Sequence, residues 1–324
     1  MNDNLISIII QGPYIDSSGF NAFSTNDVLK SARDIYPSSE IIYSGWEGVK
    51  LPKEFIKGCD KIVLSKDPGP LIIGNHNDNP VYENTNRQII STLNGLLSST
   101  KDTCIKSRSD TLFVNKMSLK LHENNPNNLF SSPIIISETF TRFHFFEYGG
   151  FKQSFGHLSD LIHIGKKKDL LKYWSGPLIK PMKLIFQDLK TRPTAEQLLF
   201  LRFLINNELF NVNNQISSKF QSSLETLDFK NYKKFIANNF MTKNESELGI
   251  SLPHRFKRTS FEKRVFINQL ILDEIKTNNI IQRKAIIRNI ITFMIFCGKN
   301  VIIKLFGRNK YKVLYNKLRE KSRH

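Results

Sequence analysis

One acidic side chain in this sequence stands where a metal or a diphosphate could be held. Asp110 follows a short apolar segment that begins at Thr103 and has the composition of a buried strand. In an α/β sheet, the carboxyl end of a central strand faces the region where ligands bind. An aspartate there could hold a divalent cation against a diphosphate, since hard cations take oxygen ligands from carboxylates and phosphates. The alternative is that Asp110 only caps a turn.

Basic side chains near Asp110 could neutralise phosphate charge. The chain contains neither a P-loop nor a Gly-x-Gly-x-x-Gly motif, so phosphate binding would depend on a metal and on basic groups. The nearest basic candidates are Arg87 and Lys106. Lys106 and Arg108 are spaced at intervals of two from Asp110 and would share one strand face with it. A cation beside a carboxylate lowers the pKa of the acid; the alternative is a purely structural ion pair.

Two further acids, Asp160 and Glu196, could act as a general base. A hydroxyl group is a poor nucleophile at neutral pH, and a carboxylate that accepts its proton during bond formation is the simplest solution. Each of these acids begins or ends an expected element. The alternative roles are local, because Glu196 could only cap its helix and Asp160 could only close a turn.

Histidine offers a second metal-ligand type. A C-terminal segment that folds back could bring His254 to the metal, since imidazole is a good ligand. The alternative is that His254 is a polar surface group. His144, His157 and His163 lie in aromatic or apolar surroundings and are expected to be satisfied core or pocket groups.

These residues require an α/β scaffold to bring them together. In the first part of the chain, apolar runs alternate with segments of helical periodicity, which predicts a mostly parallel sheet flanked by helices. The turns after parallel strands open on one edge, so Gln11, Ser44, Asp67 and Asp110 should lie near one another. We expect strands at Leu5 to Ile10, Glu40 to Ser44, Asp60 to Ser65, Asn128 to Ser137 and His157 to Gly165.

Helices are expected between these strands. One spans Asn26 to Tyr36 with Thr25 as its N-cap, and another spans Asn86 to Leu97. A third ends at Trp174, and a fourth runs from Pro193 to Ile205 with Thr194 as its cap. The segment from Pro70 to Tyr82 reads as an irregular loop, and Ser217 to Gly249 is polar and uninformative.

Composition sets the class of protein. The chain has 324 residues, 40% of them hydrophobic, which is enough for one large core or two smaller ones. Three scattered cysteines favour a reducing compartment and argue against a disulfide framework. The N-terminus lacks a basic stretch, so the apolar run at Leu5 is expected to be a strand and not a signal peptide.

Positive charge is concentrated in the last part of the chain. Residues 255–324 hold 18 Lys and Arg against four acids, so they carry +14 of the net charge of +18. Within them, Ala285 to Gly298 is apolar but interrupted by Arg288, which favours an amphipathic helix on an anionic membrane surface over a spanning helix. No zinc finger, RNA-binding or basic-zipper motif supports nucleic acid as a partner. The apolar residues could instead pack on the body as core.

Several short segments, taken in order, resemble the WavE-like lipopolysaccharide biosynthesis family. They cover about the first two thirds of the chain: Ile10-Gln11-Gly12-Pro13, Glu40 to Trp46, Asp67-Pro68-Gly69, Asn86-Arg87-Gln88-Ile89, Lys106 to Asp110 and, more weakly, Ser159-Asp160-Leu161 with Ile164-Gly165. The resemblance implies a GT-A-like (Rossmann-like) domain, here residues 1–254, followed by a basic helical extension, residues 255–324. It also implies binding of a nucleotide-diphosphate-sugar at the carboxyl edge of the sheet.

Carried over by position, the resemblance implies site roles. Gln11, Gly12 and Pro13 would lie by the nucleoside, and Trp46 and Asp67 would flank the base or ribose. Arg87 and Lys106 would face the diphosphate, and Asp110 would hold Mg²⁺ or Mn²⁺. The chain departs from the GT-A pattern in one place: Arg108-Ser109-Asp110 stands where Asp-x-Asp is usual. Arg108 could itself neutralise part of the diphosphate charge.

The sequence therefore predicts a bacterial glycosyltransferase that adds a sugar to a lipopolysaccharide, capsule or other surface-glycan acceptor. Glu196, or failing that Asp160, would deprotonate the acceptor hydroxyl. The basic tail would hold the protein on the cytoplasmic face of the inner membrane, against a glycan or glycolipid acceptor. The alternatives are a nucleotidyl- or phosphoglycosyl-transferase on the same fold, and a non-catalytic membrane-associated scaffold in polysaccharide assembly.

Overall fold

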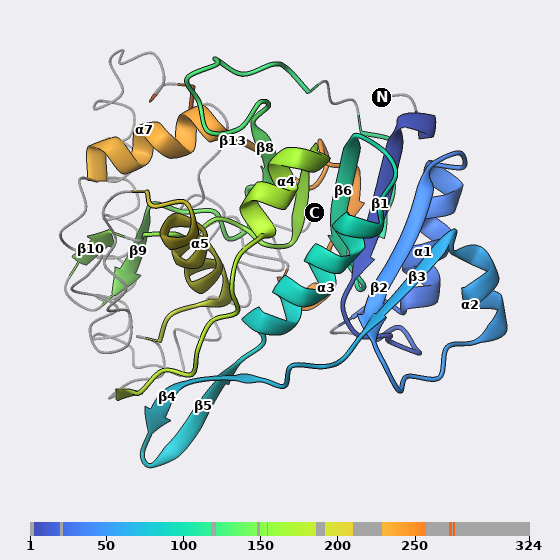
Figure 1. Ribbon diagram of the computed structural model, residues 1–324, viewed down its shortest axis with the longest axis horizontal. Helices are drawn as coiled ribbons and strands as arrows, with labels where there is room; N and C mark the ends of the chain where they lie inside the picture. Colours follow the sequence, from blue (N-terminus) through green and yellow to red (C-terminus); the bar gives the residue numbers. More distant parts are fainter. Residues whose placement is uncertain are drawn as a thin grey trace, which may run out of the picture.

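A seven-stranded mixed sheet runs through the molecule (Figure 1). The computed structural model describes residues 3–19, 22–117, 121–147, 150–153, 155–185, 192–209, 229–256, 272–273 and 275. The strands of the sheet, in spatial order, are β13 (Phe240–Lys243), β8 (Ile134–Ser137), β11 (Ile162–Lys166), β6 (Thr103–Arg108), β1 (Ile6–Gln11), β2 (Glu40–Trp46) and β3 (Lys61–Ser65). Strand β11 is antiparallel to both of its neighbours, and every other pair is parallel.

Helices cover both faces of the sheet. On one face lie α3 (Thr85–Ser98), α4 (Lys167–Trp174), α5 (Ala195–Asn206) and α7 (Phe229–Asn239), and on the other lie α1 (Thr25–Ile35) and α2 (Lys53–Gly58). Figure 1 shows α3 and α4 in front of the sheet. Strand β1 is buried along its whole length and alternates between the two cores, with Ile9 in one and Ile8 and Ile10 in the other. The predicted α/β class and mostly parallel sheet are confirmed.

Smaller elements surround the main sheet. A hairpin of β4 (Leu71–His76) and β5 (Asn79–Glu83) is joined by the short strand β12 (Leu184–Ile185). The other small pairs are β9 (His144–Glu147) with β10 (Gly150–Gln153), and β7 (Leu112–Phe113) with β14 (Ile250–Ser251). Asp3–Leu5 and His254–Phe256 form 3₁₀ turns.

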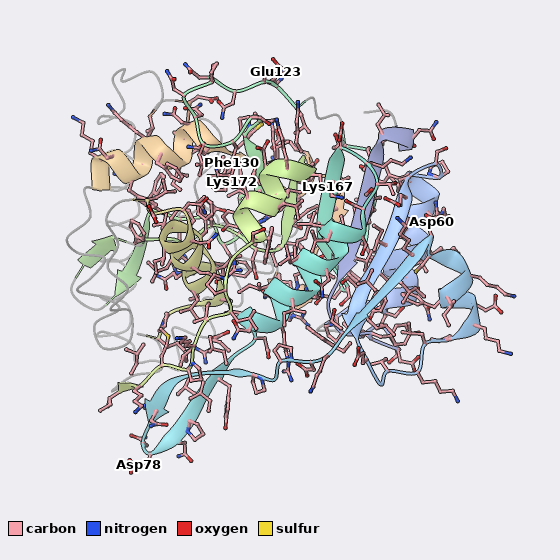
Figure 2. The ribbon with its side chains drawn as sticks, viewed as in Figure 1. Asp60, Asp78, Glu123, Phe130, Lys167 and Lys172 are labelled. Carbon is pink, nitrogen blue, oxygen red and sulfur yellow. The ribbon has the colours of Figure 1, made fainter. Side chains whose placement is uncertain are left out.

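The predicted irregular loop from Pro70 to Tyr82 is wrong, because these residues form the β4–β5 hairpin. Asn77 and Asp78 both have positive φ, 48° and 61°, which is the backbone of a tight two-residue hairpin turn. Figure 2 shows Asp78 at the tip of the hairpin, away from the main sheet. At its base, Leu71, Ile73 and Val81 pack against α5, so tertiary contacts stabilise a segment whose polar composition predicted a loop.

Several predicted boundaries shift for local reasons. The N-cap of α1 is Ser24, whose hydroxyl accepts from the backbone of Asp27 at 3.1 Å, while the Thr25 hydroxyl accepts from Ile15 N at 2.8 Å. The strand predicted from Asn128 starts only at Ile134, and the one predicted from His157 starts at Ile162. The segment that seemed uninformative contains α7 and the edge strand β13.

Most of the predicted basic tail lies outside the described residues. Within it, Leu272 is buried in the core on the α3 and α4 side, together with Ile275 at its margin. None of the helices among the described residues has the length and apolar character needed to cross a membrane. The division at residue 254 and the amphipathic helix at Ala285 to Gly298 stay predictions.

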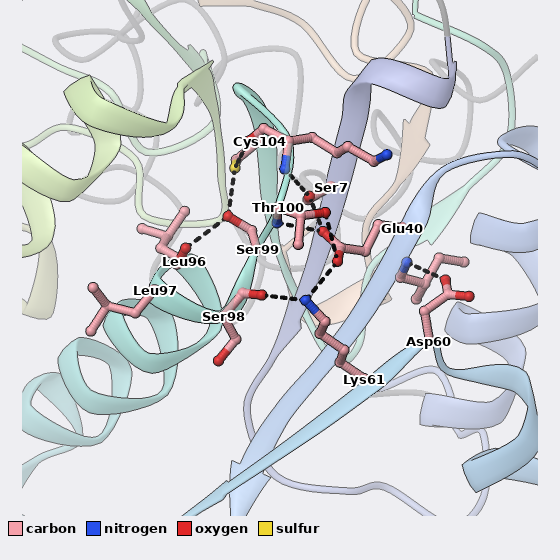
Figure 3. Close-up of polar contacts among 12 residues, drawn as sticks. Ser7, Glu40, Asp60, Lys61, Leu96, Leu97, Ser98, Ser99, Thr100 and Cys104 are labelled. Atoms are coloured by element: carbon pink, nitrogen blue, oxygen red, sulfur yellow. Dashed lines mark hydrogen bonds and ion pairs between the residues drawn. The ribbon is translucent and has the colours of Figure 1, made fainter.

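A buried carboxylate holds the amino edge of the sheet together (Figure 3). Glu40, at the start of β2, accepts hydrogen bonds from Ser7 Oγ, from Thr100 N at 2.8 Å and from Thr100 Oγ1 at 3.0 Å. It also forms an ion pair with Lys61 at 2.9 Å. Burial alone would raise the pKa of Glu40, but these partners outweigh it and lower the pKa from its ordinary value of 4.5 to about 2.

We therefore expect Glu40→Gln to remove an acid-sensitive part of the stability. Because the folded-state pKa is depressed, the stabilisation is present above pH 4.5 and is lost as the pH falls towards 2. The stabilisation by ionised Glu40 is at most about 3 kcal/mol. Solvent screening of the partly exposed Lys61 lowers it further. Urea unfolding at pH 7 and at pH 3 measures it: the variant should lose less stability than wild type between the two. The exposed Glu54→Gln in α2 is the control, and equal acid sensitivity of E40Q and wild type would contradict the assignment.

Candidate functional site

Chain direction brings the predicted site residues to one edge of the sheet. The parallel strands β1, β2 and β6 end there at Gln11, Trp46 and Arg108. Strand β11 runs the other way, with Ile162 opposite Ser107, so the residues that precede β11 reach the same edge. Asp160 therefore lies beside the end of β6, although it precedes its strand instead of following it.

Asp110 is enclosed between two arginines. Its side chain is 1% exposed, and both oxygens are engaged. Arg108 donates from Nε to Oδ1 at 3.0 Å and from Nη2 to Oδ2 at 3.2 Å, and Arg255 donates from Nη2 to Oδ2. An ion pair of Asp110 with Arg108, the alternative to a diphosphate-binding role, is present just after β6. The two guanidinium groups are more exposed than the acid, at 24% for Arg108 and 33% for Arg255.

An aromatic ring holds the two arginines beside each other. The Cζ atoms of Arg108 and Arg255 lie 5.2 Å and 4.5 Å from the ring centroid of Phe256. Phe140, from the loop after β8, packs edge-on against the same ring at 5.8 Å between centroids. Cation–π contacts of this kind favour guanidinium groups, so the cluster of Arg108, Asp110, Arg255 and Phe256 forms one unit, which we call the arginine clamp.

The arginine clamp does not fit the expected metal. Mg²⁺ and Mn²⁺ need free carboxylate oxygens, whereas both oxygens of Asp110 accept from guanidinium groups. Within the described ranges, no three His, Cys, Asp or Glu side chains are grouped so that they could hold a metal ion. The segment around His254 does fold back onto this edge, but it is the next residue, Arg255, that bonds to the carboxylate. Metal binding by Asp110 and His254 stays untested.

Lys106 is fully buried just below the arginine clamp. Its amine donates to the backbone carbonyl of Asp160 and lies 5.1 Å from the ring centroid of Trp174. Burial lowers the pKa of Lys106 to about 8, although the charge of Asp160 opposes this. The side chain predicted to face a diphosphate therefore lies inside the protein in this structure, where it holds the backbone of Asp160.

His163 supports the same interior cluster. Its Nε2 donates to the carbonyl of Ser159 at 2.8 Å, and its Nδ1 accepts from Trp174 Nε1 at 3.0 Å, which fixes the ring tautomer. Burial, with the charge of Lys106 next in importance, lowers the pKa of His163 to about 3. This histidine is therefore neutral at physiological pH and is a satisfied core group, as expected.

Glu196 lies in the first turn of α5, close to Asp160. Thr194 caps this helix as predicted, and Thr194 and Gln197 form a reciprocal capping box. Burial and then the charge of Asp160 raise the pKa of Glu196 to about 7. Burial lowers the pKa of the Arg108 guanidinium, but the charges of Asp110, Asp160 and Glu196 raise it on balance. The two predicted general bases thus lie within electrostatic reach of the arginine clamp.

The Gln11-Gly12-Pro13 turn lies at the end of the neighbouring strand. Gln11 O accepts from Ser109 N at 2.8 Å, which joins this turn to the residues after β6. Gly12 has φ 129°, a backbone conformation that favours glycine, and a Cβ there would also approach Ser109 Oγ to 2.8 Å. Among the residues that the structure describes, the buried Oε1 of Gln11 has no hydrogen-bond partner.

Asp67 and Arg87 form a separate contact. Arg87 donates to Asp67 through Nε at 2.8 Å and Nη2 at 2.6 Å, and both side chains are partly exposed. In the described part of the chain, no hydrogen bond or ion pair joins this pair to the arginine clamp. The structure thus brings Gln11, Asp110, Asp160 and Glu196 together, and it pairs Asp67 with Arg87 beside the start of α3.

Sequence reasoning missed Arg255 and Phe256. Arg255 is one of many basic residues after position 254, and nothing in its neighbours distinguishes it from them. The contact with Asp110 spans 145 positions of the chain. A contact of this range depends on the path of the C-terminal segment, which local pattern does not specify.

Comparison with known proteins identifies the family. The chain has no match among the curated proteins. The crystal structure of HddC from Yersinia pseudotuberculosis is similar at 12% identity over 58% of this chain and 87% of HddC, but at a TM-score of 0.27 this likeness carries no argument. Residues 6–305 match the family model described as WavE lipopolysaccharide synthesis, and the chain therefore belongs to the WavE family of lipopolysaccharide synthesis.

Proposed function

We propose that this protein is a glycosyltransferase with a GT-A-like domain, which moves a sugar from a nucleotide-diphosphate-sugar to a lipopolysaccharide, capsule or other surface-glycan acceptor. The observation that carries the proposal is that two acids, Asp160 and Glu196, lie within electrostatic reach of the arginine clamp at the carboxyl edge of the sheet. Sugar transfer needs these two functions together: a base for the acceptor and positive charge for the leaving diphosphate. Membership of the WavE family supports a role in the synthesis of a surface glycan.

Glu196 has the properties of the general base. Its pKa of about 7 lets the carboxyl group accept a proton near neutral pH, and its place at the N-terminus of α5 leaves it partly accessible. As the acceptor oxygen bonds to the anomeric carbon, Glu196 takes the hydroxyl proton. The bond from that carbon to the diphosphate breaks, and the nucleoside diphosphate leaves with the electron pair.

Lys106 and Asp160 position this base. The Lys106 amine fixes the backbone of Asp160. Burial and then like-charge repulsion from the Asp160 carboxylate raise the pKa of Glu196. The unpaired Oε1 of Gln11 suits recognition of a donor N–H group, and the residues Gly12, Pro13 and Trp46 remain our candidates for the nucleoside side of the site.

We also infer that the basic tail holds the protein at the cytoplasmic face of the inner membrane, near lipid-linked acceptors. This inference depends on the composition of residues 255–324, whose apolar and basic side chains suit an anionic surface.

The first prediction concerns the released product. The protein incubated with a panel of UDP-, GDP- and ADP-sugars and lipopolysaccharide acceptors should release nucleoside diphosphate, measured by ion-exchange chromatography. A nucleotidyltransferase acting on a sugar phosphate would release pyrophosphate, and a phosphoglycosyl-transferase would release nucleoside monophosphate. Either of those products, or no consumption of any donor, would refute the proposal.

The second prediction concerns Glu196. Glu196→Gln should lower kcat by about 10²- to 10⁴-fold, since an amide cannot accept the hydroxyl proton. In the wild type, kcat should rise with pH through about 7 as Glu196 ionises. The exposed Glu208→Gln, just after the same helix, is the matched control. A pH profile of kcat that is flat between pH 6 and 8 would contradict this role.

The same variant has an opposite effect on stability. The folded-state pKa of Glu196 is raised from 4.5 to about 7, so the fold loses stability as the pH rises from 4.5 to about 7, and the full penalty is present above that range. Glu196→Gln should therefore be more stable than wild type at pH 8, by at most about 3 kcal/mol, with a smaller difference at pH 5. Urea unfolding at the two pH values measures this, and it separates loss of activity from loss of folding.

A variant of Asp160 tests whether Glu196 or Asp160 is the general base. In Asp160→Asn, the charge that raises the pKa of Glu196 is removed, so the rise of kcat with pH should move below 7 while measurable activity remains. If Asp160 were itself the base, this variant would lose activity at every pH. Steady-state rates from pH 5.5 to 8.5 distinguish the two outcomes.

A further inference from the structure

We propose that the arginine clamp is a metal-independent binding site for the diphosphate of the donor. The proposal rests on the function proposed above and specifies how its leaving group is stabilised. In place of an aspartate-bound metal ion, the guanidinium groups of Arg108 and Arg255 supply the positive charge. Asp110 then positions the two guanidinium groups and does not bind a metal ion.

The charges of the clamp favour an anion. Two guanidinium groups, those of Arg108 and Arg255, face the single carboxylate of Asp110. Arg108 directs Nε and Nη2 at Asp110, and its Nη1 forms no hydrogen bond within the described part of the chain. Guanidinium donors bind phosphate oxygens with good geometry and keep their charge at any physiological pH.

The clamp is built before a ligand arrives. Two like-charged guanidinium groups repel each other, but the buried carboxylate between them and the ring of Phe256 hold both in place. Charged donors fixed in advance stabilise developing negative charge without reorganisation during the reaction. Phe140, which packs on Phe256, has φ 70°, an uncommon backbone for a bulky residue; strain of this kind gathers at functional sites.

The position of the clamp suits a diphosphate. It follows the end of β6, next to the Gln11 turn on one side and within electrostatic reach of Asp160 and Glu196 on the other. Ligands of open α/β sheets bind outside the carboxyl ends of the strands. A donor lying along this edge would place its diphosphate between a nucleoside at Gln11 and an acceptor at Glu196.

Calorimetry with the full-length protein tests the proposal. Pyrophosphate, UDP and GDP are titrated in EDTA and again with Mn²⁺ or Mg²⁺. At least one nucleoside diphosphate, and pyrophosphate itself, should bind in EDTA, with less than about a threefold gain from the metal. Arg255→Gln should weaken this binding by about 10- to 100-fold, as expected for loss of a charge-assisted contact. Lys53→Gln, which removes an exposed charge on α2, should leave it unchanged.

Asp110→Asn separates the two roles of the acid. If Asp110 positions the arginines and holds no metal ion, the variant should still bind pyrophosphate in EDTA, more weakly than wild type, and added Mn²⁺ or Mg²⁺ should change the binding of both proteins equally little. A gain from the metal in the wild type that is lost in the variant would make Asp110 a metal ligand and overturn the proposal. Binding by the wild type that appears only with Mn²⁺ or Mg²⁺ overturns the proposal without any variant, and so does unchanged binding by a folded R255Q protein.

Failure of this inference is distinguishable from failure of the proposed function. Donor consumption that stops in EDTA and returns with Mn²⁺ would support the proposed glycosyltransferase activity and refute metal-independent binding by the clamp. Pyrophosphate binding in EDTA without consumption of any donor would support the anion site and refute the proposed glycosyltransferase activity.

Discussion

The site depends on a carboxylate buried between two guanidinium groups. A charged acid that is almost fully removed from water is costly unless cations and hydrogen bonds compensate it. Asp110 obtains this compensation from Arg108, two residues away, and from Arg255, which is 145 positions away. The same contact therefore satisfies the acid, fixes the end of β6 and ties the C-terminal segment to the sheet edge. Removing either arginine would leave Asp110 with a single guanidinium partner.

The two edges of the sheet use buried charge differently. At the amino edge, Glu40 is surrounded by donors that lower its pKa, so it is a stable anion that joins three strands. At the carboxyl edge, burial and Asp160 raise the pKa of Glu196 and burial lowers that of Lys106, so both groups titrate near physiological pH. Perturbation towards neutral pH is typical of functional sites, whereas the Glu40 network is typical of a structural one.

Much of the scaffold could be predicted from local pattern. The Ile-rich run of β1, the capped helix α5 and the α3 helix all carry strong periodicity or caps, because burial on a defined face imposes it. The β4–β5 hairpin could not, since its segment is rich in Asn, Gly and Pro and is held by contacts of Leu71, Ile73 and Val81 with α5. Strand β13 was also missed, because its place in the sheet is set by pairing with β8 and not by its own short sequence.

For the site, the sequence determined which residue types could act and where they stand along the chain. They are Arg108 at the end of β6, Asp110 just after it, and Glu196 in the first turn of α5. Only the tertiary structure decided which of them meet. The antiparallel direction of β11 brings Asp160 to the carboxyl edge, and the folding back of the C-terminal segment brings Arg255 to Asp110. Strand direction and long-range ion pairs depend on the burial of the whole sheet, which is a property of the folded chain and not of any local segment.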